Sequence, residues 1–244
     1  MKPLRGITVT SRRQLAALPE LRHADFLELP ASFADDADLV IPPAWRRRFT
    51  RAECRGEART FSAVIDAVSG IRNDFFRVFA ARCEKCAALG ARAITLGIDW
   101  ENLFDDPGYA AKLREVLRCC FGIAAGHRQL VLLELRTPGI AAGRPAEFRR
   151  FRDSLLYPVR TLIDLHPHEP GALEALEKFS AALPSDVSHC RISFDAAGGN
   201  YLSAKLRERI TAAIRPVGAE NTSLCFYPGG DAGPEVFNAI FAGD

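Results

Sequence analysis

Short apolar runs alternate along the chain with longer segments in which apolar residues recur at helical spacing. An acidic residue stands near the C-terminal end of successive runs, at intervals of 30 to 38 residues: Glu28, Asp66, Asp99, Glu134, Asp164 and Asp195. One strand and its following helix take about 30 residues or more. The pattern therefore predicts a series of strand–helix units with carboxylates at matching strand ends.

Strands are predicted at residues 7–10, 25–29, 60–65, 92–98, 130–135, 160–165, 191–194 and 223–226. Helices are predicted at residues 12–21, 40–48, 73–89, 107–125, 145–156, 170–183, 202–214 and 234–241. Alternation of this kind favours a parallel sheet. Eight units in 244 residues predict an α/β fold, a single (β/α)8 TIM barrel occupying residues 1–244 as one domain.

The amino-acid composition indicates a globular protein but does not identify a ligand. The chain is 48% hydrophobic and 25% charged, which is typical of globular domains, and its net charge of +2 gives no general attraction to nucleic acid. The sequence contains no apolar run near the ~18 residues of a membrane span and no signal-peptide pattern at its start. We predict a cytoplasmic protein that binds neither nucleic acid nor membrane, and the oligomeric state stays open.

Seven cysteines, an odd and scattered set, suit a reducing compartment better than a disulfide framework. Cys83 and Cys86 have the spacing of half a zinc or redox site, but they lie within a helical pattern with no second pair nearby. We expect these two, and the adjacent Cys119 and Cys120, to be small apolar thiols that face the sheet.

Three segments carry a resemblance to a known family. They are the helix end and strand at 79–98, the strand Leu130–Glu134, and the strand Asp25–Leu29. Together they resemble the xylose isomerase-like TIM barrels, the sugar phosphate isomerase/epimerase superfamily. The resemblance implies a divalent metal such as Mn²⁺, Mg²⁺ or Zn²⁺, held by Glu, Asp, His and Glu at the ends of strands five to eight.

Two positions match that metal-binding set and two depart from it. Glu134 and Asp164 match the Glu and the Asp, whereas Asp195 stands where the His is expected. The segment 226–230 offers no Glu. The resemblance therefore implies an altered metal site at Glu134, Asp164 and Asp195.

The densest polar cluster follows the predicted strand 160–165. In an extended segment Asp164, His166 and His168 would share one side. Asp and His suit Zn²⁺ or Mn²⁺, and His also exchanges protons near neutral pH. The predicted catalytic residues are Glu134, Asp164, His166 and Asp195. The alternatives are a surface turn before the next helix, and a Glu134 that is paired with Arg136 or another cation.

The predicted substrate-binding residues are Glu28, Trp100, Arg136, His168, Gly198, Gly199, Asn200, Gly229 and Gly230. Trp100 would stack on a sugar face or else anchor its loop. The two glycine-rich loops would bind phosphate through backbone N–H groups, although glycine is also common in ordinary turns. His23, His127 and His189 precede predicted strands, so we predict structural roles for them at the opposite end of the barrel.

The sequence therefore predicts an isomerase or epimerase that moves a proton next to the carbonyl of a sugar or sugar phosphate, with or without a divalent metal. A metal-free lyase or dehydratase is an alternative, because Asp25–Glu28 also resembles the second strand of type I 3-dehydroquinate dehydratases. Segment 160–166 lacks their Schiff-base lysine. A barrel that only binds a ligand is a further alternative. An endonuclease of the same superfamily is weaker, because such sites usually gather more histidines.

Overall fold

The computed structural model describes residues 4–16, 24–30, 33, 38, 72–98, 100, 103–137, 139, 144–184, 186–196, 202–214, 223–229 and 232–241. Several predictions fall outside these residues. They are the strand at 60–65, the short helix at 40–48, Asp66, Asp99, and the loop residues Gly198, Gly199, Asn200 and Gly230.

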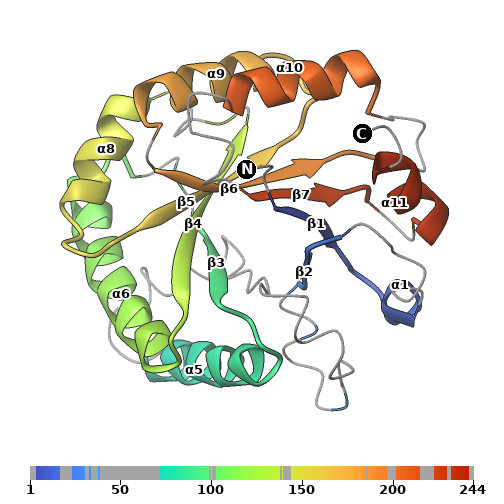
Figure 1. Cartoon of the computed structure of the whole chain (residues 1–244). Helices are drawn as coiled ribbons and strands as arrows, with labels where there is room; N and C mark the ends of the chain where they lie inside the picture. Colours follow the sequence, from blue (N-terminus) through green and yellow to red (C-terminus); the bar gives the residue numbers. More distant parts are fainter. Residues whose placement is uncertain are drawn as a thin grey trace.

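Seven parallel strands in the described part form one sheet in the order β2-β1-β7-β6-β5-β4-β3. They are β1 (Arg5–Thr8), β2 (Phe26–Glu28), β3 (Ala93–Gly97), β4 (Leu130–Thr137), β5 (Arg160–Leu165), β6 (Val187–Ser193) and β7 (Ser223–Tyr227). The first strand pairs with the last, with Gly6 opposite Cys225. This pairing curls the sheet (Figure 1), so the predicted TIM-barrel fold is confirmed.

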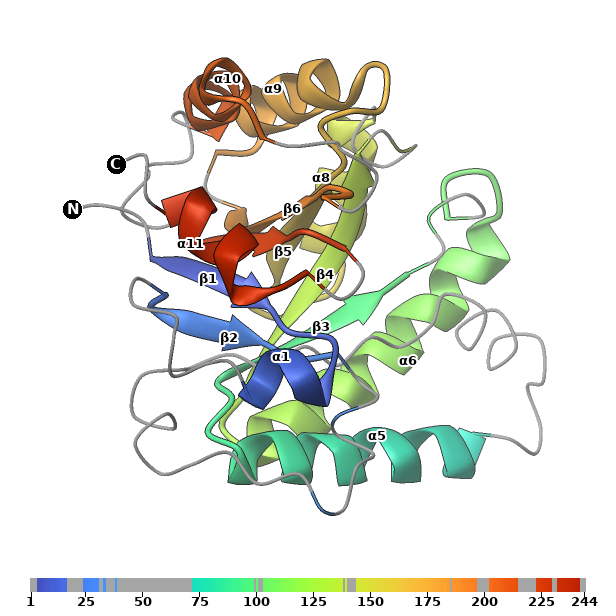
Figure 2. The ribbon, with the colours of Figure 1, turned by 90° about the vertical axis from the view of Figure 1, so that its right-hand side faces the viewer.

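Helices alternate with the strands, as predicted. They are α1 (Arg12–Ala16), α5 (Arg72–Ala88), α6 (Pro107–Gly126), α8 (Pro145–Asp153), α9 (Ala172–Ala182), α10 (Ala204–Ile214) and α11 (Pro234–Phe241). Helices α5, α6, α8, α9 and α10 follow one another around the outside of the curled sheet (Figures 1 and 2). None of the described helices has the length and hydropathy that a membrane span requires.

Local sequence explains where helix α6 begins. Asp106 is its N-cap, and its side chain accepts hydrogen bonds from the backbone N–H groups of Gly108 and Tyr109. Pro107 occupies the first turn, where a missing N–H costs nothing. The helix then buries an apolar stripe that includes Leu113 and Leu117. The helix packs against β4.

Strand residues alternate between the two faces of the sheet. On β4, Leu133 and Leu135 belong to the main core under the helices, whereas Leu132 joins Ala93 and Leu162 in a separate small cluster. That cluster lies on the inner face, because neighbouring residues of a strand point to opposite sides. The inner face is therefore a packed interior near the strand beginnings rather than a pore.

The expectation for the cysteines is largely confirmed. Cys83, Cys86 and Cys120 are buried in the core, but Cys119 is exposed. The prediction was wrong for Cys119 because adjacent residues on a helix point about 100° apart, so both thiols of this pair cannot face the sheet.

Candidate active site

Inward-facing side chains change character along the strands. The inward-facing side chains run from Leu132 through Glu134 to Arg136 on β4, from Leu162 through Asp164 to His166 just beyond β5, and from His189 through Arg191 to Ser193 on β6, as strand alternation places them. The register sets Glu134 beside Leu162, and it sets Asp164 beside Arg136 and Arg191. The interior thus passes from an apolar floor to a charged layer and then to a polar mouth at the C-terminal strand ends, where TIM barrels carry their active sites.

Arg191 is the centre of the charged layer. Its side chain is completely buried. Its Nε donates to Glu28 Oε1 at 2.5 Å, and its NH1 lies 3.2 Å from Glu134 Oε2 and 3.6 Å from Asp164 Oδ2. One guanidinium therefore links carboxylates from three strands, β2, β4 and β5. The sequence prediction missed this residue.

Glu28 lies deeper than a substrate-binding residue would, with 3% of its surface exposed. Thr8 Oγ1 donates to Glu28 Oε1 at 2.9 Å, and His189 Nε2 lies 2.7 Å from Glu28 Oε2. Burial alone would raise the pKa of Glu28, but the charge of Arg191 and the hydrogen bond from His189 hold it well below its ordinary value. Glu28 is a permanent buried anion.

The position predicted for His189 was wrong, whereas its structural role stays a prediction. His189 lies within β6, not before it, and is fully buried inside the barrel, where its ring packs edge-on against Phe26. Its Nδ1 lies 2.6 Å from Ser223 Oγ, so both ring nitrogens have partners. The error arose because the predicted strand began at Arg191, four residues later than the observed strand.

Asp164 connects the charged layer to the mouth. Ser193 Oγ donates to Asp164 Oδ1 at 2.5 Å, and His166 Nε2 lies 3.3 Å from Asp164 Oδ2. Burial alone would raise the pKa of Asp164, but the charge of Arg191 and the contact with His166 lower it to about 2. Asp164 therefore stays ionised at neutral pH and orients His166.

We expect this pKa shift to appear as acid sensitivity. The pKa of Asp164 falls from 3.8 to about 2 on folding, so the unfolded chain binds more protons between these values. The stabilisation is present above about pH 4 and is lost as pH falls to about 2, by roughly 2 kcal/mol. Urea unfolding at several pH values from 6 to 2.5 measures it. The Asp164→Asn variant should lose stability less steeply, and an equal slope would contradict the assignment.

A cleft of about 290 Å³ opens above Asp164. Its lining comes from the ends of β5, β6 and β7: His166, His168, Glu169, Ser193, Phe194, Asp195 and Tyr227. His168 and Asp195 are exposed at its edge, and His166 is half-buried. The structure thus brings His166, His168 and Asp195 together around one cleft, with Asp164 beneath His166.

Arg136 points to the same mouth. The sequence suggested Glu134 as its partner, but it pairs with Glu169. Its NH2 donates to Glu169 Oε1 at 2.6 Å. The alternative partner for Glu134, a neighbouring cation, is supplied by Arg191. Glu134 keeps 16% of its side chain exposed, more than Glu28 or Asp164.

Trp100 is buried, and its Nε1 donates to the backbone oxygen of Glu134 at 2.7 Å. Its ring packs edge-on against Phe148 and Phe151 of α8. These contacts favour the anchoring role over stacking on a sugar face, and they fix the backbone that carries Glu134.

Gly229 is the described member of the two predicted phosphate loops. It has a φ of +71°, and a Cβ there would lie 3.1 Å from the backbone oxygen of Phe194. Ala196 N donates to Pro228 O nearby, so the exits of β6 and β7 are held together. Gly229 therefore has a structural reason to be glycine, and its phosphate-binding role stays a prediction.

The predicted metal position is a poor fit for a metal ion. Arg191 NH1 contacts one carboxylate oxygen of Glu134 and one of Asp164, so the guanidinium lies between the two predicted ligands. Asp195 lies at the exposed edge of the cleft rather than in the buried layer. The side chains as arranged place a guanidinium where the prediction placed a metal.

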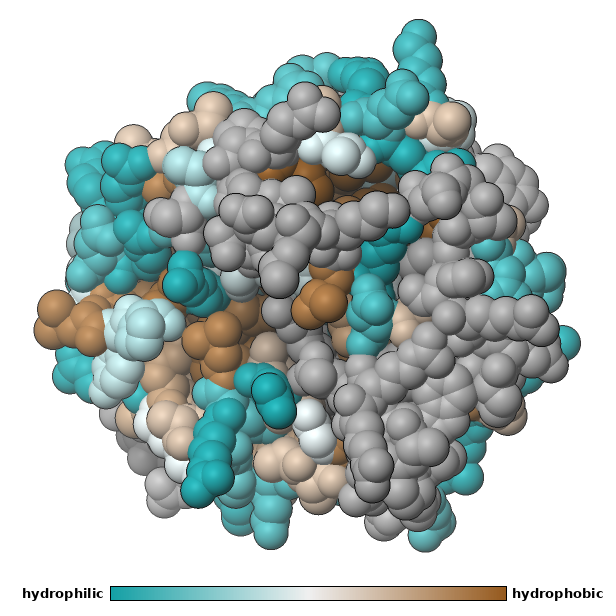
Figure 3. Space-filling view, in the orientation of Figure 1, coloured by the Kyte–Doolittle hydropathy of each residue, from teal (hydrophilic) through white to brown (hydrophobic). Residues whose placement is uncertain are grey.

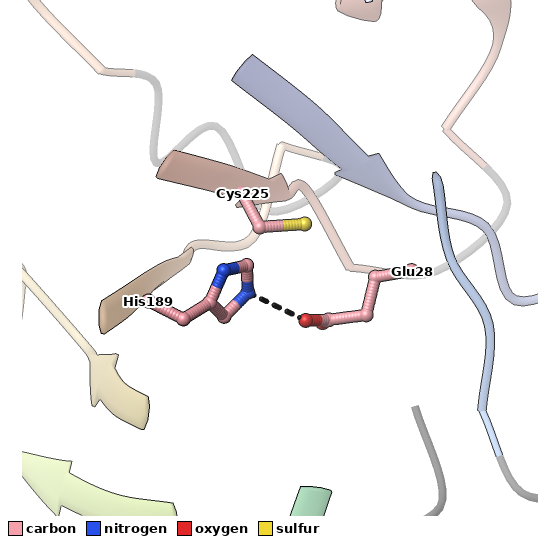
Figure 4. A group of neighbouring side chains, drawn as sticks. All are labelled: Glu28, His189 and Cys225. Carbon is pink, nitrogen blue, oxygen red and sulfur yellow. Dashed lines mark hydrogen bonds and ion pairs between the residues drawn. The ribbon is translucent and has the colours of Figure 1, made fainter. Parts of the chain in front are cut away.

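A second group offers metal-ligand chemistry: Glu28, His189 and Cys225, whose ligand atoms all lie within 4.8 Å of one another (Figure 4). In this arrangement Glu28 and His189 are hydrogen-bonded to each other, and the Cys225 sulfur lies 3.3 Å from Thr8 Oγ1. Entry of an ion would break these contacts. The group therefore matches a metal site in composition but serves here as a hydrogen-bonded network.

No protein-family model matches the sequence, and no curated protein shows detectable sequence similarity to it. Solved structures do match. A xylose isomerase domain protein from Planctomyces limnophilus is 13% identical over 99% of this chain and 96% of its own, with a TM-score of 0.66. An AP endonuclease of family 2 from Brucella melitensis is 17% identical over 98% of both chains, with a TM-score of 0.69.

A D-psicose 3-epimerase from Clostridium cellulolyticum H10, solved with D-tagatose, is 16% identical over 100% of this chain and 92% of its own, with a TM-score of 0.62. At these identities the matches establish the fold. The chain has the TIM-barrel fold of these proteins, which is the fold that the resemblance in the sequence implied. The matches include both sugar epimerases and an endonuclease, so the fold leaves the reaction open.

Proposed function

We propose that the protein is an isomerase or epimerase of a small sugar or sugar phosphate. One observation carries the proposal: Arg191 joins Glu134 to Asp164, and Asp164 in turn contacts His166, which lines a cleft of about 290 Å³. A cleft of this size suits a monosaccharide better than a polymer.

In this proposal the two groups that are open to the mouth exchange protons with the substrate. Glu134 takes the proton from the carbon next to the carbonyl. His166, oriented by Asp164, gives a hydrogen bond or proton to the carbonyl oxygen, on which negative charge develops. His166 is suited to this role because an imidazole ring can donate a hydrogen bond or a proton from a ring nitrogen.

The rest of the cleft offers polar groups for a sugar. His168, Asp195 and the edge residue Tyr227 can bind hydroxyl groups, while Phe194 supplies an apolar wall. The Arg136–Glu169 ion pair borders the same mouth and is a proposed contact for a phosphate or a ring hydroxyl. The known sugar epimerases of similar fold support this substrate class.

Incubation of the protein with aldoses, ketoses and their phosphates in D₂O tests the proposal. We expect deuterium to replace the hydrogen next to the carbonyl of at least one sugar, as followed by proton NMR. A His166→Asn variant should exchange about 100-fold more slowly, since asparagine keeps a polar side chain but does not act as a general acid or base.

A matched control is Glu177→Gln, which changes an exposed carboxylate on α9 and should leave the exchange rate unaltered. Exchange with none of the sugars would refute the proposed reaction. If a sugar nevertheless binds in ligand-observed NMR, the alternative of a barrel that only binds its ligand gains support.

A further inference from the structure

The charged layer holds a built-in cation. Arg191 reaches Glu28, Glu134 and Asp164 from a position in the middle of β6, and its side chain has no solvent exposure. Three carboxylates around a single buried positive charge form an unusual arrangement, because buried charges persist only when they are paired and hydrogen-bonded.

The guanidinium is held from several sides. Its Nε donates to Glu28, which is itself fixed by Thr8 and His189. The planar fork of a guanidinium suits such multiple contacts with carboxylates, and it carries its charge at every physiological pH. Movement of Arg191 out of the layer would leave all three carboxylates without that charge.

A divalent ion would compete directly with this group. Coordination of Glu134 Oε2 and Asp164 Oδ2 requires bonds of about 2.0–2.2 Å. These same two oxygens lie 3.2 Å and 3.6 Å from Arg191 NH1. An ion there would therefore stand against a like charge in a buried region, where such repulsion is screened only weakly.

We propose that Arg191 supplies the permanent positive charge of this site in place of a divalent metal ion, and that the protein works without one. Arg191 has no exposed surface through which to touch a substrate, so it is a positioning residue. It holds Glu134 and Asp164 in place beneath the cleft. The role of Arg191 in catalysis rests on the proposed isomerase or epimerase function. Its occupation of the site in place of a metal ion does not.

Binding of Mn²⁺, measured by the loss of its free EPR signal, tests the proposal on the full chain. The wild-type protein should bind Mn²⁺ only weakly. The Arg191→Ala variant should bind one ion at least about 100-fold more tightly, because three neighbouring carboxylates then face an empty space with no positive charge beside it. The Arg209→Ala variant, which removes an exposed arginine paired with Glu174, should behave as wild type.

A second measurement, of melting temperature, keeps the test valid if the Arg191→Ala variant is unstable. Mn²⁺ should raise the melting temperature of Arg191→Ala by several degrees and leave that of the wild type unchanged, since a ligand stabilises only the state that binds it. If Arg191→Ala does not fold even with Mn²⁺, the wild-type titration alone decides. Tight binding of one Mn²⁺ by the wild type, abolished in Asp164→Asn, would overturn the proposal.

The test of the role of Arg191 can fail or succeed independently of the test of the proposed sugar reaction. Sugar exchange that continues in the presence of EDTA supports both proposals. Exchange that stops with EDTA and returns with Mn²⁺ overturns the role of Arg191 and leaves the reaction standing. The third possible result combines three observations: no sugar exchange, weak Mn²⁺ binding by the wild type, and tighter binding by Arg191→Ala. This result would refute the reaction and support the role of Arg191.

Discussion

Replacement of Glu134 by glutamine is expected to slow the proposed proton exchange by about 10²- to 10⁴-fold. Glutamine keeps the length of the side chain and can still meet Arg191 NH1 through its amide oxygen. It cannot accept a proton from carbon. Solvent-deuterium exchange on the best sugar substrate, with kcat and KM measured separately, gives the result.

The loss should appear in kcat, because the variant keeps the shape of the site while it loses the base. Glu177→Gln on the outer face of α9 is again the matched control, with the same change in charge far from the mouth. A Glu134→Gln protein that exchanges sugars at the wild-type rate would remove this residue from the mechanism.

Replacement of Arg191 by methionine is expected to lower the free energy of unfolding by about 3–5 kcal/mol. Methionine fills much of the volume of the arginine side chain, so the main effect on stability is the loss of the positive charge. Glu28 and Asp164, which are almost fully buried, would lose their positive partner. Urea unfolding at pH 7 measures the change.

Two further variants separate charge from packing. Arg209→Met removes an exposed arginine 3.8 Å from Glu174 and should cost no more than about 1 kcal/mol. In the Arg191→Met background, Glu28→Gln should restore part of the stability, because it removes one of the stranded charges. If Arg191→Met unfolds at the wild-type urea concentration, the buried network contributes little to stability.

Much of the barrel follows from short-range patterns. The apolar run Leu130–Leu135 and the helical spacing of residues 107–125 correspond to β4 and α6. Both are recognisable because a strand buried on two faces and an amphipathic helix impose clear periodicities. The helix predicted at 145–156 ends earlier, at Asp153, because the chain turns at Ser154 and Leu155.

The mouth was predictable in part. Asp164 lies near the end of β5, and His166, His168 and Asp195 follow the ends of β5 and β6. The parallel arrangement brings these last three residues to one cleft. Glu134 points into the barrel from β4 and contacts Arg191. The sequence reasoning looked for carboxylates at strand ends, so it gave Glu28 a place at the rim, although Glu28 lies in the buried layer.

The sequence around His189 and Arg191 contains an alternating polar pattern that the prediction did not use. Polar His189, Arg191 and Ser193 alternate with apolar Cys190 and Ile192, which is the period of a strand with one polar face. The pattern indicates an inward polar stripe on β6. It does not give the partners, because the contact between Arg191 and Glu28 joins residues 163 positions apart.

The pairing of the first strand with the last affects how the chain is made. Thr8 meets Cys225 across 217 residues, and Glu28 meets His189 across 161. During synthesis the amino-terminal strands must wait until nearly all of the polypeptide has left the ribosome before these partners exist. Glu28 therefore spends that interval hydrated by water, and the burial of its charge is among the late events of folding.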